Sequence, residues 1–221
     1  MLEPIAEGVW VAHTPHVMMG LHLGTRMTVV RLADGLWVHS PIGLGGGLRE
    51  AVDALGEVRH VVAPNVYHHM YVPEAMAAWP DATLHAPASL RKKRRDLDIH
   101  RTLSEERVWG DALEPLTIDG CMLEETVFFH PSTRTLVTSD LTENFQSCDH
   151  LPTRLYLKAS GTYGKVGWPR PLRLLYRDRR AARASVERLL AWDFDRVVIA
   201  HGTDILREGA KDAVRRTFEF L

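Results

Sequence analysis

The sequence predicts four stretches in the order β-rich, α/β, β-rich, α/β. In the β-rich stretches we expect antiparallel strands, and in the α/β stretches helices separate short apolar strands. This order limits the possible folds more than any single motif does. Asp34-Gly35 lies between two apolar runs and predicts a hairpin. The expected elements of the first half are strands at 8–12, 26–32, 36–39, 58–63 and 83–86, and helices at 48–56, at 73–79 and after Pro87.

The second half again has a β-rich stretch followed by an α/β stretch, without similarity of sequence to the first half. It predicts strands at 124–129 and 134–138, a helix at 178–192, a strand at 196–200, and a last helix that presents Ala210, Val214, Phe218 and Leu221 on one face. Residues 141–174 show no clear pattern. No linker or repeat divides the chain, so we expect one domain over residues 1–221. The order predicts an α/β protein, a four-layer sandwich with helices outside two sheets.

Composition excludes several classes of protein. The 221 residues carry 27 Lys and Arg against 28 Asp and Glu, so a dedicated nucleic-acid binder is not expected. Two Cys against twelve His rule out a disulfide framework and a Cys-based zinc finger. No apolar stretch is long enough to span a membrane, and the N-terminus does not resemble a signal peptide. We therefore expect a cytoplasmic protein with reduced thiols.

Two segments could bind anions but have simpler interpretations. Residues 43–47 are rich in glycine, yet Leu48 stands where the last Gly of a G-x-G-x-x-G motif is needed. We interpret this segment as a loop before a helix. Residues 91–95 are five consecutive cations. We interpret them as a solvated helix face, with a patch for an anionic ligand as the alternative.

Three sites combine metal-binding side chains with the end of a predicted strand. Tyr67-His68-His69 follows the strand that ends at Ala63, Asp140 follows the strand at 134–138, and His201 follows the strand at 196–200. Strand ends are held by the backbone ladder, while the loop beyond leaves room for a ligand. Imidazole and carboxylate are both ligands of divalent cations.

These residues, together with the opening hairpin from Val9 to Val38, resemble the metallo-β-lactamase-like superfamily. The matching segments are 64–69 (Pro-Asn-Val-Tyr-His-His), 128–130 (Phe-Phe-His), 138–140 (Thr-Ser-Asp) and 199–202 (Ile-Ala-His-Gly). The resemblance covers nearly the whole chain and implies an αββα sandwich. In that superfamily an H-x-H-x-D-H motif, a separate His, a bridging Asp and a last His hold two metals.

The chain departs from this motif. Pro64 and Val66 fall on the two leading His positions, and no His is present near Cys121, where the separate His is expected. The resemblance then implies a mononuclear site whose metal ligands are His68, His69, Asp140 and His201. A shift of one residue would instead place Asn65 and Tyr67 on the leading positions. Each candidate also has a purely structural alternative, as a cap, a turn residue or a strand end.

Other residues receive secondary roles. We expect Asp140, Tyr67 and His130 to be catalytic: Asp140 would orient a water or take its proton, and Tyr67, His130 or Asn144 would steady an oxyanion. His130 has two alternatives, a ligand or partner of the site and a hydrogen bond to a turn. Asn144 and His150 follow Asp140 and could face the site. Cys121 is interpreted as a buried apolar residue.

Three functions are consistent with this pattern. The first is a metal-dependent hydrolase that activates water for attack on a small-molecule substrate. The second is a mononuclear non-haem iron enzyme with redox or O₂ chemistry, and the third is a non-catalytic binding protein on a degenerate scaffold. The expected cofactor is one divalent metal ion, Zn, Fe or Mn. The expected partners are a small-molecule substrate and a second copy of the chain in a homodimer, without nucleic acid or membrane.

Overall fold

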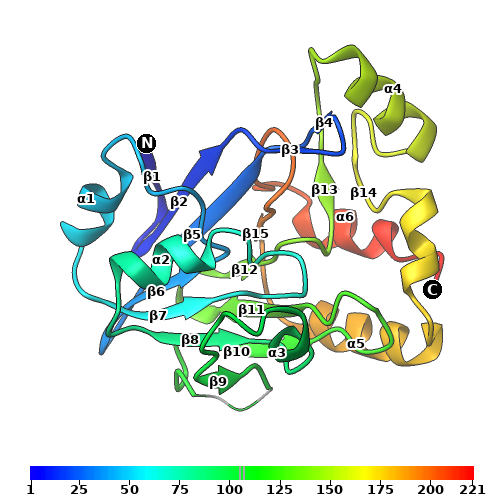
Figure 1. Ribbon diagram of the computed structural model, residues 1–221. Coiled ribbons are helices and arrows are strands. Elements are labelled where there is room, and N and C mark those ends of the chain that lie inside the picture. Colours follow the sequence, from blue (N-terminus) through cyan, green and yellow to red (C-terminus); the bar gives the residue numbers. More distant parts are fainter. Residues whose placement is uncertain (105, 107) are drawn as a thin grey trace. The chain divides into compact units, whose positions relative to one another are not determined.

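The computed structural model describes residues 1–104, 106 and 108–221. The chain forms two compact units, which we describe one at a time (Figure 1). Unit 1 consists of Met1–Thr14 and Arg26–Ser104, and unit 2 consists of Pro15–Thr25 and Glu105–Leu221. Each unit contains a sheet and helices, so the α/β class is confirmed. The assignment of residues 1–221 to one domain stays a prediction.

Unit 1 is built on a mixed sheet with the strand order β1-β2-β5-β6-β7-β8-β9. The β1–β2 and β5–β6 pairs are antiparallel, whereas β6, β7, β8 and β9 run parallel. Parallel neighbours require crossovers, and the three helices of unit 1 supply them. The bounds are β1 (Leu2–Ala6), β2 (Val9–Thr14), β5 (Thr25–Leu32), β6 (Gly35–His39), α1 (Leu48–Asp53), β7 (Val58–Val62), α2 (Val72–Ala78), β8 (Thr83–Ala86), α3 (Leu90–Lys93) and β9 (Arg101–Thr102).

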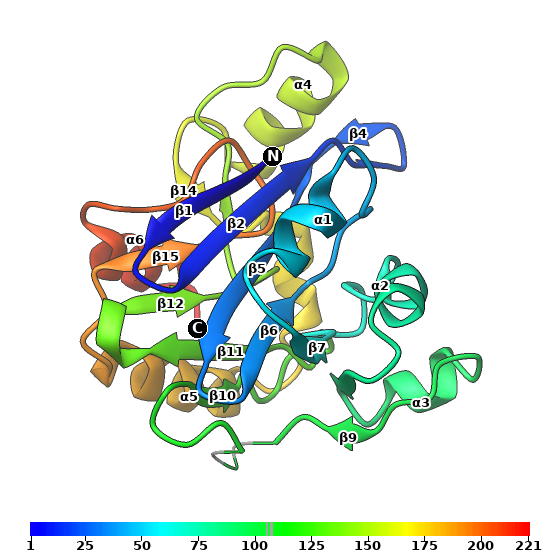
Figure 2. The same cartoon turned by 90° about the vertical axis from the view of Figure 1, so that its left-hand side faces the viewer.

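The core of unit 1 lies on one face of this sheet. Alternate strand residues such as Val38, Val61 and Leu84 join Val52 of α1 and Val72 of α2 in one buried cluster. Figure 2 shows α1 in front of β5 and β6. This alternation is the pattern on which the predicted strands rest. The predicted helix at 48–56 is confirmed as a shorter α1, and the predicted helix at 73–79 is confirmed as α2, shifted by one residue. The edge strand β1 was not predicted, because Pro4 breaks its pattern, and an edge strand tolerates proline.

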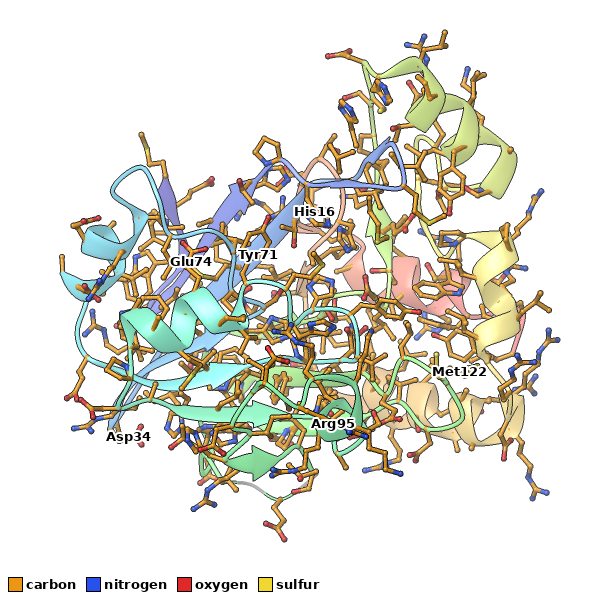
Figure 3. The ribbon with its side chains drawn as sticks, viewed as in Figure 1. His16, Asp34, Tyr71, Glu74, Arg95 and Met122 are labelled. Atoms are coloured by element: carbon orange, nitrogen blue, oxygen red, sulfur yellow. The ribbon has the colours of Figure 1, made fainter. Side chains whose placement is uncertain are left out.

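The glycine-rich segment 43–47 is a loop between β6 and α1. The backbone N–H of Leu44 donates to the Glu74 carboxylate of α2 at 2.8 Å. Figure 3 labels Glu74 on that helix. A carboxylate of the chain itself therefore holds this amide, which agrees with the interpretation of the segment as a connection rather than a phosphate loop.

The opposite face of the unit 1 sheet carries three histidines on neighbouring parallel strands, His39, His60 and His85. His60 Nδ1 lies 3.2 Å from His85 Nε2, and its Nε2 lies 3.1 Å from the Asp34 carboxylate in the β5–β6 turn (Figure 3). Burial, with a smaller effect of the charge of His68, lowers the pKa of His39 to about 3. Burial and then the charge of His60 lower the pKa of His85 to about 3. Both imidazoles are therefore neutral in the folded protein.

The two neutral imidazoles predict loss of stability in acid. In the unfolded chain each histidine binds a proton below pH 6.5, the ordinary pKa of histidine. In the folded protein His39 and His85 bind that proton only at about pH 3. The stabilisation is therefore fully present above pH 6.5 and is lost as pH falls toward 3. The unfolding free energy of the wild type falls between pH 6.5 and pH 4. We expect this fall to be about 3 kcal/mol smaller in His85→Gln, which has no imidazole to protonate. Urea unfolding at several pH values measures this, and parallel curves for variant and wild type would contradict it.

Unit 2 contains a four-stranded sheet with the order β10-β11-β12-β15. The first three strands are antiparallel neighbours, and β15 lies parallel to β12. The bounds are β10 (Glu114–Thr117), β11 (Thr126–His130), β12 (Thr135–Val137), α5 (Arg179–Ala191), β15 (Arg196–Val198) and α6 (Ala210–Thr217). The predicted strands at 124–129, 134–138 and 196–200 are thereby confirmed with shifted ends.

The helices α5 and α6 pack on this sheet. Val186 of α5 and Val214 of α6 lie in one cluster with Leu136 and Val197 of the strands. The Asp178 carboxylate caps α5 by accepting the N–H groups of Arg180 and Ala181. The predicted helix at 178–192 is confirmed, while α6 ends at Thr217, before the predicted Leu221.

The segment without a clear sequence pattern contains short elements. The helix α4 (Leu151–Ser160) has Pro152 in its first turn and ends at Gly161, which adopts φ 82°. The other short elements of unit 2 are β3 (Val17–Met18), β4 (Leu21–His22), η1 (Pro131–Thr133), β13 (Glu143–Asn144), β14 (Val166–Gly167) and η2 (Arg170–Leu175). Two-residue strands cannot show a period, so only their pairing in the folded chain defines them.

Within the described ranges, no helix combines the length and the apolar character that crossing a bilayer requires.

Candidate metal centre

In unit 2, Asp140 and His201 leave the sheet side by side. They follow β12 and β15, which are parallel neighbours and so end at the same edge of the sheet. Thr138 N–H donates to the Val198 carbonyl at 3.0 Å, which extends the pairing beyond β12. His201 Nε2 lies 3.0 Å from Asp140 Oδ1. The structure thus brings together two of the predicted metal ligands.

A hydrogen bond from Nδ1, the ring nitrogen that does not face Asp140, orients the His201 ring. Nδ1 lies 2.7 Å from the Gly24 carbonyl oxygen, which can only accept, so Nδ1 carries a proton. Burial acts to lower the pKa of His201, but the hydrogen bond and charge of Asp140, with Gly24 and Glu143, raise it overall. Histidines that bind metals commonly donate the second ring N–H to a carbonyl or carboxylate in this way.

Glu143 adds a second buried carboxyl group near this pair. Its neighbour Asn144 forms a β-bridge with Gly202, so β13 runs beside the His201 loop. Burial raises the pKa of Glu143 to about 7. The charge of His201 acts to lower this pKa, and the charge of Asp140 acts to raise it further. Among the described residues, Glu143 Oε2 has no hydrogen-bond partner. A buried carboxyl oxygen without a donor is costly, and a cation or a proton would satisfy it.

The Glu143 carboxyl predicts a pH dependence of stability in chelator-treated protein. Between pH 4.5 and 7 the folded protein keeps a proton that the unfolded chain releases. The stabilisation is fully present below pH 4.5 and is lost as pH rises through 7. Glu143→Gln cannot ionise, so we expect its unfolding free energy relative to wild type to rise by about 3 kcal/mol over this range. Denaturant titrations at several pH values measure the difference, and a constant offset would refute it.

In unit 1, the loop at 64–69 is fixed by two side chains. Asn65 is fully buried, and its Oδ1 accepts the N–H groups of Tyr67 at 2.8 Å and His68 at 2.9 Å. His68 Nδ1 lies 2.6 Å from the Ser40 hydroxyl at the end of β6. Ser40 has φ 52°, a left-handed conformation that is costly for serine. Strain at this position accompanies a contact that orients His68.

His69 and two cations at the end of α3, Lys93 and Arg94, form a second set of contacts around the same loop. Arg94 Nη1 donates to His69 Nδ1 at 2.7 Å, so the proton of neutral His69 lies on Nε2. Burial, then the charges of Lys93 and Arg94, lower the pKa of His69. Lys93 donates to the Val66 carbonyl at 2.7 Å and lies over the Tyr67 ring. The sequence indicates that the five cations at 91–95 form a solvated helix face. In the structure two of them, Lys93 and Arg94, instead contact this loop.

Comparison with solved structures identifies the fold. A metallo-β-lactamase from Pontibacter korlensis has a TM-score of 0.66 at 13% identity, covering 100% of this chain and 99% of that one. One from Hirschia baltica has a TM-score of 0.67 at 13% identity, covering 98% and 97%. The DIM-1 metallo-β-lactamase has a TM-score of 0.67 at 13% identity, covering 100% and 97%. The chain has the metallo-β-lactamase fold.

Comparison of sequences adds less. Residues 6–90 match a family described as a domain of unknown function, DUF4336. No curated protein matches the chain. The expected resemblance to the metallo-β-lactamase-like superfamily is therefore confirmed as a shared fold.

The remaining predicted residues of this metallo-β-lactamase fold have other surroundings. His130 ends β11 beside Thr135 at the start of β12, whereas Asp140 follows the other end of β12. Its ring lies 2.7 Å from the Thr133 hydroxyl, so the structure does not bring His130 together with Asp140. Tyr67 is half exposed beside Lys93.

Three further candidates also have structural partners. Asn144 N–H donates to the His201 carbonyl at 3.2 Å, and its side chain donates to the Asp204 carbonyl at 2.9 Å. His150 stacks on His22 at 3.7 Å and contacts Thr153. Cys121 is buried in the core, as predicted, and burial raises its pKa to about 11.

Proposed function

We propose that this protein is a metal-dependent hydrolase that holds one divalent cation and acts on a small-molecule substrate. The observation that carries the proposal is the Asp140–His201 pair, 3.0 Å apart at the ends of parallel strands in a metallo-β-lactamase fold. Imidazole and carboxylate together are a donor set for Zn, Fe and Mn. The nearby Glu143 carboxyl, with its unsatisfied Oε2, supports a cation in this region.

We further propose His68 as a metal ligand, as the sequence motif predicts. Its support is the sequence motif together with the Ser40 contact at Nδ1, which parallels the Gly24 contact at Nδ1 of His201. His69 stays a prediction as the fourth ligand. Because Arg94 donates to His69 Nδ1, binding through Nε2 would require the loss of its proton. We therefore expect His69→Ala to weaken metal binding less than His68→Ala.

The proposed chemistry divides between the cation and the chain. When bound, a divalent cation lowers the pKa of a coordinated water toward about 7. Asp140 would orient that water and accept its proton, and the Tyr67 phenol would donate a hydrogen bond to a developing oxyanion. Burial keeps His201 and Glu143 in a medium where charge interactions are strong. His130 stays a predicted catalytic residue without a contact that supports this role.

Metal analysis and turnover together test the proposal. The protein is purified without a His tag, stripped with a chelator, and titrated with Zn²⁺, Mn²⁺ and anaerobic Fe²⁺, then assayed on ester, thioester, lactam and phosphodiester substrates. We expect about one equivalent of metal and hydrolysis that is lost on chelation and restored by metal. Failure of all three cations to bind would overturn the proposal. Oxygen-dependent turnover with Fe²⁺ alone would favour a redox enzyme, and metal binding without turnover a binding protein.

A further inference from the structure

Glu125 is a buried carboxylate of unit 2 that neither the motif nor the proposed ligand set includes. It is 2% exposed. Each of its two oxygens accepts one backbone N–H: Oε1 accepts that of Ser139 at 2.8 Å, and Oε2 accepts that of Asp140 at 2.9 Å. A carboxylate that receives two consecutive amides is among the strongest contacts available to a main chain. Here the amides belong to Asp140 and the residue before it.

The local backbone is shaped to present this carboxylate. Glu124 adopts φ 50° and closes a turn in which its N–H donates to the Cys121 carbonyl at 3.2 Å. Ile118 N–H then donates to the Glu125 carbonyl at 2.8 Å, just before β11 begins. Because β11 and β12 are antiparallel neighbours, the start of β11 lies beside the end of β12. The Glu125 side chain thus reaches the segment that carries Asp140.

The segment that carries Asp140 lies beyond the end of the strand. β12 ends at Val137, and past Thr138 the Ala200 N–H donates to the Ser139 carbonyl at 3.4 Å. The N–H groups of Ser139 and Asp140 point to Glu125 instead. Glu125 also places a negative charge near the Asp140 carboxylate, which is unfavourable by itself. A neutral acceptor would fix the backbone without that repulsion, and a bound cation offsets the charge.

We propose that Glu125 is the positioning residue of Asp140: by binding the amides of Ser139 and Asp140, it sets the direction in which the Asp140 carboxylate meets His201 and the affinity of the site for a divalent cation. The inference rests on the proposed metal site. Outer partners of this kind typically change metal affinity by about 10–100-fold when they are removed.

Two variants test the positioning role of Glu125 while keeping a polar side chain at residue 125. Glu125→Gln keeps the shape but offers one acceptor oxygen, and Glu125→Asp keeps the charge but shortens the reach by one methylene. In metal-free protein we expect both to speed hydrogen exchange of the Ser139 and Asp140 amides by about 10-fold or more, because a local hydrogen bond is lost. In Mn²⁺ titrations followed by calorimetry we expect each to raise the dissociation constant about 10–100-fold.

Ser185→Ala is the matched control for a merely structural effect. The Ser185 hydroxyl is also buried in unit 2 and accepts a backbone N–H, that of Asp119 at 3.1 Å, away from Asp140. We expect this variant to lower the melting temperature while Mn²⁺ affinity stays within about twofold of wild type. If Glu125→Gln and Ser185→Ala lower both quantities equally, Glu125 has only a structural role and the inference is overturned.

Two further outcomes separate the inference from the proposed function. If wild type binds Mn²⁺ and both Glu125 variants bind it equally well, the inference fails and the hydrolase proposal stands. If wild type binds neither Mn²⁺ nor any other divalent cation, the proposed function fails, and the inference about affinity fails with it. Weaker binding by Glu125→Gln and Glu125→Asp, with faster exchange at Asp140, supports both.

Discussion

His201→Ala is expected to weaken binding of Zn²⁺ or Mn²⁺ by about 10²–10³-fold, since one of a few protein ligands would be lost from a site whose total binding energy is of the order of 10 kcal/mol. The ring is buried, and its Nε2 lies 3.0 Å from Asp140. Alanine removes the imidazole donor and leaves Asp140 without its partner. Metal competition with a fluorescent chelator measures the affinity, and hydrolysis at saturating metal reports whether the remaining ligands support turnover.

His130→Ala is the matched comparison for this prediction. His130 is also a buried histidine of unit 2, but its ring contacts Thr133 at the opposite end of β11. We expect its metal affinity to match that of wild type. Equal losses for His130→Ala and His201→Ala would show that the strand-end pair is not the metal centre.

Gly202→Ala is expected to destabilise unit 2 by about 3 kcal/mol or more, because a side chain at this position has no space. Gly202 has φ 118°, and a Cβ built there would lie 2.1 Å from the Asn144 carbonyl oxygen and 2.5 Å from its carbon. These are backbone atoms of β13, so the strand itself would have to move away from the His201 loop. Thermal and urea unfolding measure the loss, and we expect metal binding to weaken with it.

Gly164→Ala separates crowding from backbone strain in this experiment. Gly164 also has a positive φ, 72°, but nothing lies within 4 Å of a Cβ built there. Only the conformational penalty of about 1–2 kcal/mol applies. A loss for Gly202→Ala no larger than that for Gly164→Ala would mean that β13 does not pack against the loop as the structure has it.

Much of the fold is predictable because buried strands and amphipathic helices have a local period. The strand at 26–32 and the helix at 178–192 are long enough for that period to be visible, and both are confirmed. The segment at 141–174 is not predictable in the same way. Its strands β13 and β14 have two residues each and exist because Asn144 pairs with Val166 and bridges to Gly202. Such pairings depend on residues far apart in the chain.

The site shows the same division. Residue type and position at a strand end identified Asp140 and His201 as candidates, and the resemblance to the metallo-β-lactamase-like superfamily placed them in one ligand set. The structure adds the reason why they lie together: they follow β12 and β15, which are parallel neighbours. Glu125, Ser40 and Arg94 could not be found this way, because each acts through a partner that only the folded chain brings within hydrogen-bond distance.

By itself, therefore, the sequence determined the α/β class, the main strands and helices, and the positions of two candidate metal ligands at strand ends, since these depend on local period and on residue type. Only the tertiary structure decided what surrounds them: that His130 contacts a turn at the far end of β11, that Arg94 occupies one nitrogen of His69, and that Glu125 holds the amide of Asp140. Strand register and side-chain contacts at long range decide these positions, and neither has a local signal.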